Sequence, residues 1–291
     1  MTTPGSTLSG SALPRGSKRP RQLFGRTLDD NALLVAAACV IGFLYLPIVV
    51  LIVFSFNDNP VTTLPLRGFT LEWYRAALSN EDMLAAVWNS VLVGLAAVCL
   101  CLAIGLPAAF ALDRIDFPGK VIFRRFALLP ITLPGLITGI AMLNFFRAMG
   151  MELTLGTVIL GHGTALTAVV ITQVFARLQR FDRRYEEASA DLGAKPWQTF
   201  TRITFPNIRS AVIGSGLLSF TLSFDEIPVT FFLIGRDNTL PMYIYSTIRR
   251  GITPEVNAIG TLIVLFSLCL ILFSVYLLYS EAGDTDQQRH R

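Results

Sequence analysis

The sequence predicts an all-α protein that crosses a lipid bilayer six times, and three observations predict this class. Of its 291 residues, 53% are hydrophobic and only 15% are charged. With a mean hydropathy of +0.57, the chain is too apolar for an ordinary soluble domain. Five apolar runs carry no charged residue and are long enough to cross the hydrocarbon core, which takes about 20 residues of helix. A sixth run has the same length and composition but contains two carboxylates.

The six predicted spans follow one another along the chain with short connections. They cover residues 32–56, 84–112, 126–146, 153–176, 210–235 and 256–280. Kinks are expected where proline removes a backbone N–H from a span and neighbouring helices satisfy the freed carbonyl. The prolines concerned are Pro47, Pro107, Pro130, Pro134 and Pro228.

The positions of Lys and Arg predict the direction of each span. With the N-terminus inside, eighteen of the 24 Lys and Arg residues fall in inner segments and six in outer segments. Because positive residues gather on the cytoplasmic side of short loops, both termini are expected in the cytoplasm. The same asymmetry accounts for the net charge of +4, so the basic balance does not indicate nucleic-acid binding.

One membrane domain is expected between two polar tails. Residues 1–30 are rich in Ser, Gly, Pro and Arg, and this composition predicts a disordered cytoplasmic tail. The transmembrane domain covers residues 31–280, and residues 281–291 form a second cytoplasmic tail. The first apolar run is too long for a signal-peptide core and has no small-residue cleavage site behind it, so we expect it to be retained as the first span.

Several other classes of protein are excluded by composition. The 22 Gly and 15 Pro show no period, and the four cysteines all lie within apolar runs, so neither a collagen-like nor a disulfide-stapled protein is indicated. With two histidines and no Cys or His pair at ligand spacing, the sequence predicts no metal site. There is no Gly-x4-Gly-Lys-Ser/Thr loop, which predicts that this chain does not itself bind ATP.

The longest inner connection, residues 177–209, is predicted to fold into a protruding foot. Residues 185–192 are typical of a short helix, and Gly193 follows where a left-handed C-terminal cap favours glycine. Pro196 lies in the first turn of a second short helix, and Pro206 is expected to stop it. The apolar residues expected along one face of this second helix are Phe200, Ile203 and Phe205. An amphipathic helix on the membrane surface is the alternative interpretation.

Within this connection the residues resemble the EAA loop of permease subunits from binding-protein-dependent ABC importers. The family pattern is Glu-Ala-Ala, three residues, Gly, nine residues, Ile, one residue and Leu-Pro. The chain has the same spacing without a gap, in Glu187, Ala188, Ser189, Gly193, Ile203, Phe205 and Pro206. Ser189 replaces the second Ala and Phe205 replaces Leu, and these changes keep a small and an apolar side chain respectively.

The resemblance implies a fold, a location and a set of partners. It implies the type I ABC importer (MetI-like) permease fold, with six transmembrane helices and cytoplasmic termini, in the bacterial inner membrane. In that family a heterodimer of two related permease chains forms the pathway, and it works with two copies of an ABC ATPase subunit and a periplasmic substrate-binding protein. ATP and Mg²⁺ are then bound by the ATPase, while this chain contacts membrane lipid, has no catalytic residue and binds no cofactor or metal.

The family's EAA loop, also called the coupling helix, docks in a groove on the ATPase. The resemblance implies that residues 178–206 are this loop. Glu187 would face a basic or amide group of the ATPase, and Gly193 would set the elbow. The other residues implied in this contact are Ala188, Ser189, Trp197, Phe200, Ile203 and Pro206, of which Trp197, Phe200 and Ile203 would fill the groove.

Within the family, the resemblance is closest to the second permease subunit of spermidine/putrescine importers, and it extends over residues 30–280. The similar strings lie at residues 68–74, 88–90, 219–226, 240–246 and 253–258. The resemblance therefore implies import of a polyamine such as putrescine or spermidine. Importers of opines, amino-acid-like compounds and other small solutes belong to the same subgroup and are the alternative.

Two carboxylates in the fifth predicted span, Asp225 and Glu226, are candidate substrate residues. Asp225 lies about 15 residues from the inner end of the span, or roughly 22 Å, in the outer third of the hydrocarbon. Carboxylates at this depth usually face a cavity or a partner. With Tyr243 and Tyr245 they would bind a di-ammonium chain by ion pairing and cation–π contact. The alternative is an outer gate or an ion pair to the partner permease.

Two other functions fit parts of the sequence. A cation-coupled secondary transporter would use Asp225 and Glu226 as its ion site, but it leaves the foot unexplained. A membrane enzyme would use His162 and the acidic pair as acid and base. One histidine and two carboxylates in separate spans do not make a convergent catalytic cluster, so we favour an interior hydrogen-bonded role for His162.

Overall fold

The computed structural model describes residues 30–59, 65–251 and 253–269, and these ranges are predominantly helical, as the sequence predicts. They contain no β-strand, only an isolated antiparallel bridge between Asn57 and Phe69. The chain divides into two compact units, Met1–Val50 and Leu51–Arg291, and each is described by itself. The two predicted tails, residues 1–30 and 281–291, lie outside the described residues except for Asp30, which begins α1.

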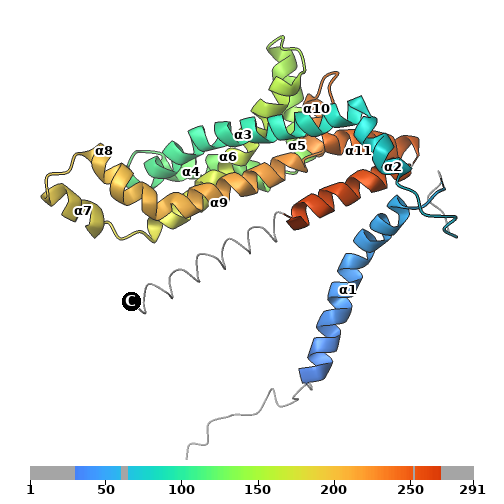
Figure 1. Cartoon of the computed structure of the whole chain (residues 1–291). Coiled ribbons are helices and arrows are strands. Elements are labelled where there is room, and N and C mark those ends of the chain that lie inside the picture. Colours follow the sequence, from blue (N-terminus) through green and yellow to red (C-terminus); the bar gives the residue numbers. More distant parts are fainter. Residues whose placement is uncertain (1–29, 60–64, 252, 270–291) are drawn as a thin grey trace, which may run out of the picture. The chain divides into compact units, whose positions relative to one another are not determined.

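The helices follow one another in the order shown in Figure 1. They are α1 (Asp30–Ser55), α2 (Glu72–Ser79), α3 (Glu81–Arg114), α4 (Lys120–Thr132), α5 (Gly135–Ala148), α6 (Leu155–Gln179), α7 (Arg184–Asp191), α8 (Pro196–Thr199), the π-helical turn η1 (Phe200–Thr204), α9 (Phe205–Phe224), α10 (Pro228–Leu233) and α11 (Leu240–Arg250). A further apolar helix covers Pro254–Cys269.

Three of the described helices, α1, α3 and α6, are long and apolar enough to cross a membrane, and the bent pair α4 and α5 adds a fourth candidate. These helices match the first four predicted spans. The fifth predicted span is divided between α9 and α10. Of the sixth, residues 256–269 are helical, and residues 270–280 lie outside the described part of the chain. The count of six crossings and the cytoplasmic termini therefore stay predictions.

The third predicted span, residues 126–146, is a broken helix rather than one kinked helix. The axes of α4 and α5 differ by 109°. Leu133 is extended, with φ −84° and ψ 135°, because the ring of Pro134 excludes the helical conformation from the residue before it. Pro134 then begins α5, where its carbonyl accepts the N–H groups of Ile137 and Thr138. The break thus falls at Pro134, one of the prolines where a kink was expected, but the bend separates two helices instead of kinking one.

Capping residues set where the long helices begin. The side chain of Asn80 accepts the N–H of Met83 at 3.1 Å and caps α3. Thr154 and Thr157 form a reciprocal capping box at the start of α6. The side chain of Thr154 accepts a backbone N–H of the first turn, and the side chain of Thr157 accepts the backbone N–H of Thr154. Both helices therefore have a fixed N-terminus on the same side of the bundle.

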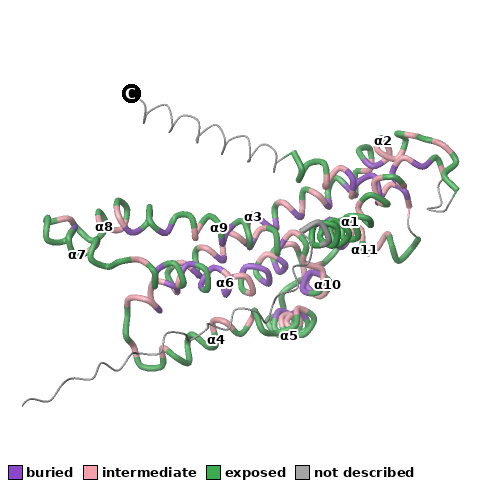
Figure 2. Tube along the Cα trace, turned by 90° about the horizontal axis from the view of Figure 1, so that it is seen from below, coloured by how far each residue is buried: buried purple, intermediate pink, exposed green. Residues whose placement is uncertain are grey.

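The second unit is built around α3, α6 and α9, which lie side by side in Figures 1 and 2. Their contact is a buried apolar cluster that includes Cys101 on α3, Val170 and Val174 on α6, and Ile208 on α9. All four cysteines are free, and of the burial predicted for them only that of Cys101 is found, since Cys39, Cys99 and Cys269 are exposed. In Figure 2 the buried positions follow the inner faces of these helices, while α7 and α8 are largely exposed at one end.

Candidate functional site

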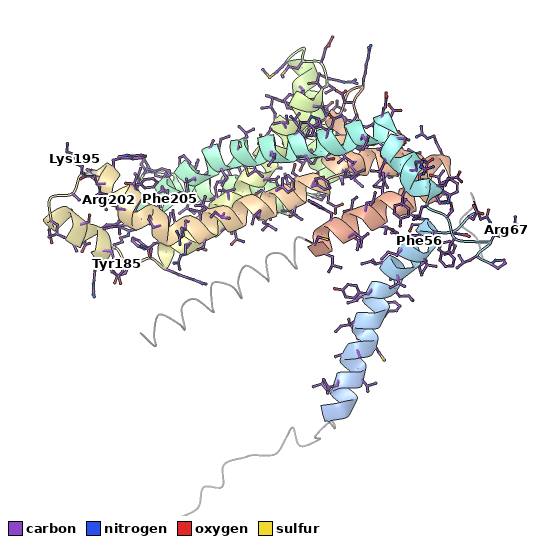
Figure 3. All side chains as sticks on the ribbon, in the orientation of Figure 1. Phe56, Arg67, Tyr185, Lys195, Arg202 and Phe205 are labelled. Atoms are coloured by element: carbon purple, nitrogen blue, oxygen red, sulfur yellow. The ribbon has the colours of Figure 1, made fainter. Side chains whose placement is uncertain are left out.

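The foot, defined as residues 178–206, lies at one end of the three-helix bundle. Figure 3 shows Tyr185, Lys195, Arg202 and Phe205 together at this end, and Phe56 and Arg67 at the opposite end of the same unit. The first helix of the foot, α7, agrees with the predicted helix at residues 185–192. Gly193 has φ +81°, which confirms the predicted left-handed cap.

The second helix of the foot does not stop at Pro206, which corrects the sequence interpretation. Helices α8, η1 and α9 are continuous from Pro196 to Phe224. In η1 the N–H of Phe205 bonds to the carbonyl of Phe200, five residues back, so the helix widens before the proline. The side-chain amide of Asn207 donates to the carbonyl of Ile203 at 2.7 Å. The side-chain amide of Asn207 thus donates a hydrogen bond in the turn where Pro206 has no backbone N–H to donate.

The aromatic residues of the foot face in two directions. Phe200 is half-buried, and its ring lies edge-on to Phe110 of α3, with 5.7 Å between centroids. Trp197 stacks on the other side of Phe200 at 5.5 Å and is 72% exposed. Leu192, beside the elbow, is 89% exposed. Phe200 thus packs within this chain, whereas Trp197 and Leu192 present apolar surface to the outside.

The residues of the EAA pattern also differ in their surroundings. Glu187 and Ala188 are exposed, and the carboxylate of Glu187 makes no hydrogen bond or ion pair with any described residue, although its backbone N–H bonds to the carbonyl of Arg183. The hydroxyl of Ser189 is buried and shares a hydrogen bond of 2.9 Å with that of Thr199. Ser189 therefore joins the two helices of the foot, a contact that the alanine of the family pattern does not make. Ile203 is half-buried.

The sequence analysis missed Glu186, the neighbour of Glu187. Its carboxylate bonds to the guanidinium of Arg114 on α3 at 2.8 and 2.9 Å and accepts the hydroxyl of Thr204. The signal available in the sequence was the presence of opposite charges at the ends of two inner segments, Asp113-Arg114 and Arg183 to Glu186. Their pairing depends on tertiary contact, so spacing alone did not reveal it.

The fifth predicted span is interrupted at residues 225–227, between α9 and α10. Glu226 accepts the N–H of Val229 at 3.0 Å through its side chain, and its carbonyl accepts the hydroxyl of Thr230 at 2.8 Å. It therefore caps the first turn of α10. Asp225 is exposed at the end of α9. The two adjacent carboxylates thus have different roles in the fold.

The two tyrosines proposed with them lie on α11. The hydroxyl of Tyr243 accepts a hydrogen bond from Asn80 at 3.1 Å. The ring of Tyr245 lies edge-on to Phe231 of α10 at 6.5 Å and carries the guanidinium of Arg249 at 5.7 Å. Among the described residues, no hydrogen bond joins either tyrosine to Asp225 or Glu226. Tyr245 therefore lies beside α10, whereas Tyr243 bonds to the residue that caps α3, and neither tyrosine is paired with the carboxylates.

His162 joins both sides of the interruption to α6. The imidazole is buried, with Nδ1 at 2.8 Å from the hydroxyl of Ser223 on α9 and Nε2 at 2.9 Å from the hydroxyl of Thr230 on α10. The interior hydrogen-bonded role predicted for it is confirmed. A small cavity of about 40 Å³ adjoins His162, Ser223 and Glu226.

An open hollow of about 740 Å³ lies where the connection before α6 meets the connection after α10, and its lining includes four charged residues. Arg147 comes from the last turn of α5, Glu152 from the connection before α6, and Arg236 and Asp237 from the connection after α10. No group of three potential metal ligands occurs among the residues that the structure describes.

Comparison with known proteins gives one family and consistent relatives. The family "Binding-protein-dependent transport system inner membrane component" matches residues 101–280. The spermidine/putrescine transport system permease protein PotC of Haemophilus influenzae is 34% identical over 236 residues, which cover 81% of this chain and 91% of that protein. The putrescine transport system permease protein PotI of Escherichia coli K12 is 37% identical over 229 residues, with 76% and 81% covered.

A similar fold occurs in a solved structure. A chain of a bacterial ABC transporter involved in the import of the acidic polysaccharide alginate superposes with a TM-score of 0.65 at 18% identity, covering 89% of this chain and 99% of that chain. This likeness shows the predicted importer permease fold. It carries no information about the solute, because the identity is low.

Proposed function

Because the chain belongs to the family of binding-protein-dependent transport system inner membrane components, we propose that it is one permease subunit of an ATP-driven importer that carries a polyamine into the cytoplasm. The family and both named relatives are transport components. The chain is therefore a transport subunit and not an enzyme, as the sequence predicts. The membrane in question is the bacterial inner membrane.

The observation that carries this proposal is the surface of the foot. Leu192 and Trp197 are 89% and 72% exposed on a polar protrusion, and the carboxylate of Glu187 beside them is unpaired among the described residues. Exposed apolar anchors next to an unpaired charge are typical of a protein interface. An ATPase groove with an apolar floor and a basic or amide group at its edge fits this surface.

The remaining partners follow from the same proposal. A second, related permease subunit completes the pathway, two copies of an ATPase subunit bind ATP and Mg²⁺, and a periplasmic binding protein delivers the solute. This chain then binds no cofactor of its own. Residues 31–280 form its membrane domain, with residues 178–206 as the coupling loop between the ATPase and the membrane helices.

The continuous helix from the foot to the interruption suggests how ATP-driven movement reaches the pathway. Helix α9 has 20 residues, which gives it a length of about 30 Å. A displacement of Trp197 by the closing ATPase is transmitted along this helix, because η1 and α9 are joined without a loop. It arrives at Asp225, where the helix ends. Alternating access then opens the interruption to one side of the membrane at a time.

Asp225 is the carboxylate best suited to meet a cationic solute. The carboxylate of Glu226 accepts a hydrogen bond from the N–H of Val229, whereas Asp225 is exposed at the end of α9. An ammonium group of a polyamine would form a charge-assisted hydrogen bond with Asp225. Tyr243 and Tyr245 on α11 would then line the path of the alkyl chain.

The proposed function is tested by ATP hydrolysis of the complex purified with this chain, in lipid, together with its binding protein. The panel consists of putrescine, spermidine, opines and small amino acids. We expect putrescine or spermidine to stimulate hydrolysis. If hydrolysis copurifies but only an opine or amino acid stimulates it, the polyamine assignment is wrong and the importer class stands. If no ATPase copurifies and uptake follows the proton gradient, the chain is a secondary transporter.

Replacement of Gly193 tests the elbow of the foot. A residue with a side chain at φ +81° carries about 1–2 kcal/mol of strain, and a β-branched one is the worst case. We expect Gly193→Val to lower ATP-driven uptake by about fivefold or more, with the melting temperature of the membrane part unchanged. Gly193→Asn is the matched control, since asparagine tolerates the left-handed region and no atom crowds this position. Equal uptake by both variants and the wild type would contradict the elbow's role.

Replacement of Asp225 tests the solute contact. We expect Asp225→Asn to raise the KM for putrescine uptake about tenfold or more, because a hydrogen bond to a charged group contributes about 1.5–3 kcal/mol. Asp237→Asn, which removes an exposed carboxylate after α10, serves as the control. An unchanged KM with altered basal hydrolysis would assign Asp225 to a gate instead.

A further inference from the structure

A cluster of alternating charges lies where the foot adjoins the end of α3. Its members are Asp113, Arg114, Arg183, Glu186 and Thr204. They come from the last turn of α3, the start of α7 and the η1 turn. None of them belongs to the exposed face of the foot that includes Trp197, so the cluster is separate from the proposed ATPase contact.

The centre of the cluster is the pair of Arg114 and Glu186. Nη1 lies 2.8 Å from Oε2 and Nη2 donates to Oε1 at 2.9 Å, so two parallel bonds join the side chains. This fork geometry fixes the relative orientation of the two groups as well as their distance. The side chains are only 22% and 23% exposed. Partial burial lessens the screening that makes fully exposed ion pairs weak.

Thr204 connects the same carboxylate to a third element. Its hydroxyl, which is buried, donates to Oε1 of Glu186. Since Thr204 is the last residue of η1, directly before α9, one carboxylate bonds both to α3 and to the helix that continues into the membrane domain. The ring contact of Phe110 with Phe200 joins the same two elements nearby.

Asp113 and Arg183 extend the pairing at the other side of Arg114. Arg183 donates to the carbonyl oxygen of Asp113 at 2.8 Å and to its Oδ2 at 3.2 Å, and Nε of Arg114 lies 3.2 Å from the same Oδ2. The Asp113 side chain is only 6% exposed. Two positive and two negative groups thus balance within the cluster, so it needs no counter-charge from a partner.

We propose that Glu186 is a positioning residue that clamps the foot to α3, so that a movement of the foot displaces α3 together with α9. This inference rests on the proposed function. In the sequence, the foot directly follows α6 and directly precedes α9, but it does not adjoin α3. The foot therefore reaches α3 through side-chain contacts. Without the clamp, the ATPase still docks on the exposed face of the foot, but hydrolysis no longer moves α3 in step. In this proposal Glu187 contacts the ATPase, and Glu186 transmits the movement of the foot to α3.

The experiment compares uptake per ATP hydrolysed in vesicles that hold the complete complex and its binding protein. We expect Glu186→Gln and Arg114→Gln each to lower this ratio about tenfold, within the usual range of coupling energies. The amount of ATPase bound to the chain stays at the wild-type level. Thr204→Val keeps the ion pair and is expected to lower the ratio about threefold. Exchange of the charges, Glu186→Arg with Arg114→Glu, restores the ion pair but places a carboxylate beside Asp113 and removes the acceptor for Thr204, so we expect it to recover only part of the coupling lost in the single variants.

Asp116→Asn is the control on the same surface. Asp116, in the connection after α3, forms an ion pair with Lys120, the first residue of α4, at 2.9 Å. The hydrogen bond and the charge of Lys120, and to a smaller extent the charge of Arg183, lower the pKa of Asp116. This variant therefore also removes an ion pair, but not one between α3 and the foot. We expect it to leave uptake per ATP unchanged.

Two results would overturn the clamp. One is a wild-type ratio in Glu186→Gln, or in Thr204→Val if the former does not assemble. The other is loss of bound ATPase from the Glu186 variants, which would make Glu186 a docking residue. Failure of the proposed function itself is distinguishable, because the wild-type complex would then show no ATP-driven uptake at all.

Discussion

Replacing Gly235 with alanine is expected to remove a large part of the stability of the folded chain. A Cβ at this position would overlap the backbone carbonyl oxygen of Leu153, just before α6. The position of a Cβ is fixed by the backbone, and the atom it meets is itself a backbone oxygen, so no side-chain rotation relieves the overlap. The same two segments are joined by the hydroxyl of Thr157, which donates to the carbonyl of Leu233 at 2.8 Å in a buried position. Separating them breaks this bond as well, and the cost is about 3 kcal/mol or more.

The yield of monodisperse chain in detergent and its melting temperature measure this effect. Gly214→Ala is the matched control, because no atom lies within 4 Å of the added Cβ and the residue is within α9. We expect the control to fold at least as well as the wild type, since alanine favours a helix over glycine by about 1 kcal/mol. A Gly235→Ala chain with the same melting temperature as the control would show that the two connections separate without cost.

Replacing His162 with leucine is expected to lower uptake by about tenfold or more, with a smaller loss of stability of about 1–3 kcal/mol. The imidazole is the one group seen to bond to both Ser223 and Thr230 among the described residues. After the change, Thr230 keeps its bond to the carbonyl of Glu226, and helical serine hydroxyls can bond to a carbonyl of their own helix. The main loss is therefore the connection across the interruption, not an unsatisfied hydroxyl.

Uptake kinetics and melting temperature, measured together, separate the two effects. His162→Gln is the control, since its amide offers a donor and an acceptor in a similar volume; we expect it to retain more uptake than the leucine variant. If the leucine and glutamine variants transport equally well, the bonds of His162 do not hold the interruption in its working geometry.

Much of the helical architecture follows from local rules. The second predicted span, residues 84–112, corresponds to α3 at Glu81–Arg114, because a long apolar run and an Asn cap are sufficient to define it. The elbow at Gly193 was predictable for a similar reason, since a left-handed cap favours one residue type. These features depend on residues close together in the chain.

Other features were not revealed by the sequence, one of them local and two that depend on residues far apart in the chain. Pro206 was expected to stop a helix, but the widened η1 turn and the amide of Asn207 accommodate it. Phe200 was assigned to a partner's groove, whereas it packs on Phe110, ninety positions earlier. The pairing of Glu186 with Arg114 spans 72 positions. The roles proposed for the foot and for Asp225 are predictions from sequence and family, to which the structure adds geometry.

The π turn at Phe200–Thr204 also fixes the azimuth of the foot. One residue of an α-helix corresponds to a rotation of about 100°, and a π turn holds about one residue more than an α turn. The direction in which Trp197 points is therefore decoupled from the faces that α9 presents to α3 and α6. Deleting one residue here would rotate the docking surface by roughly a quarter turn relative to α9, and it would also break the contacts of Phe200 and Glu186 with α3. Insertions and deletions within these five residues would therefore change the direction in which the foot faces its partner.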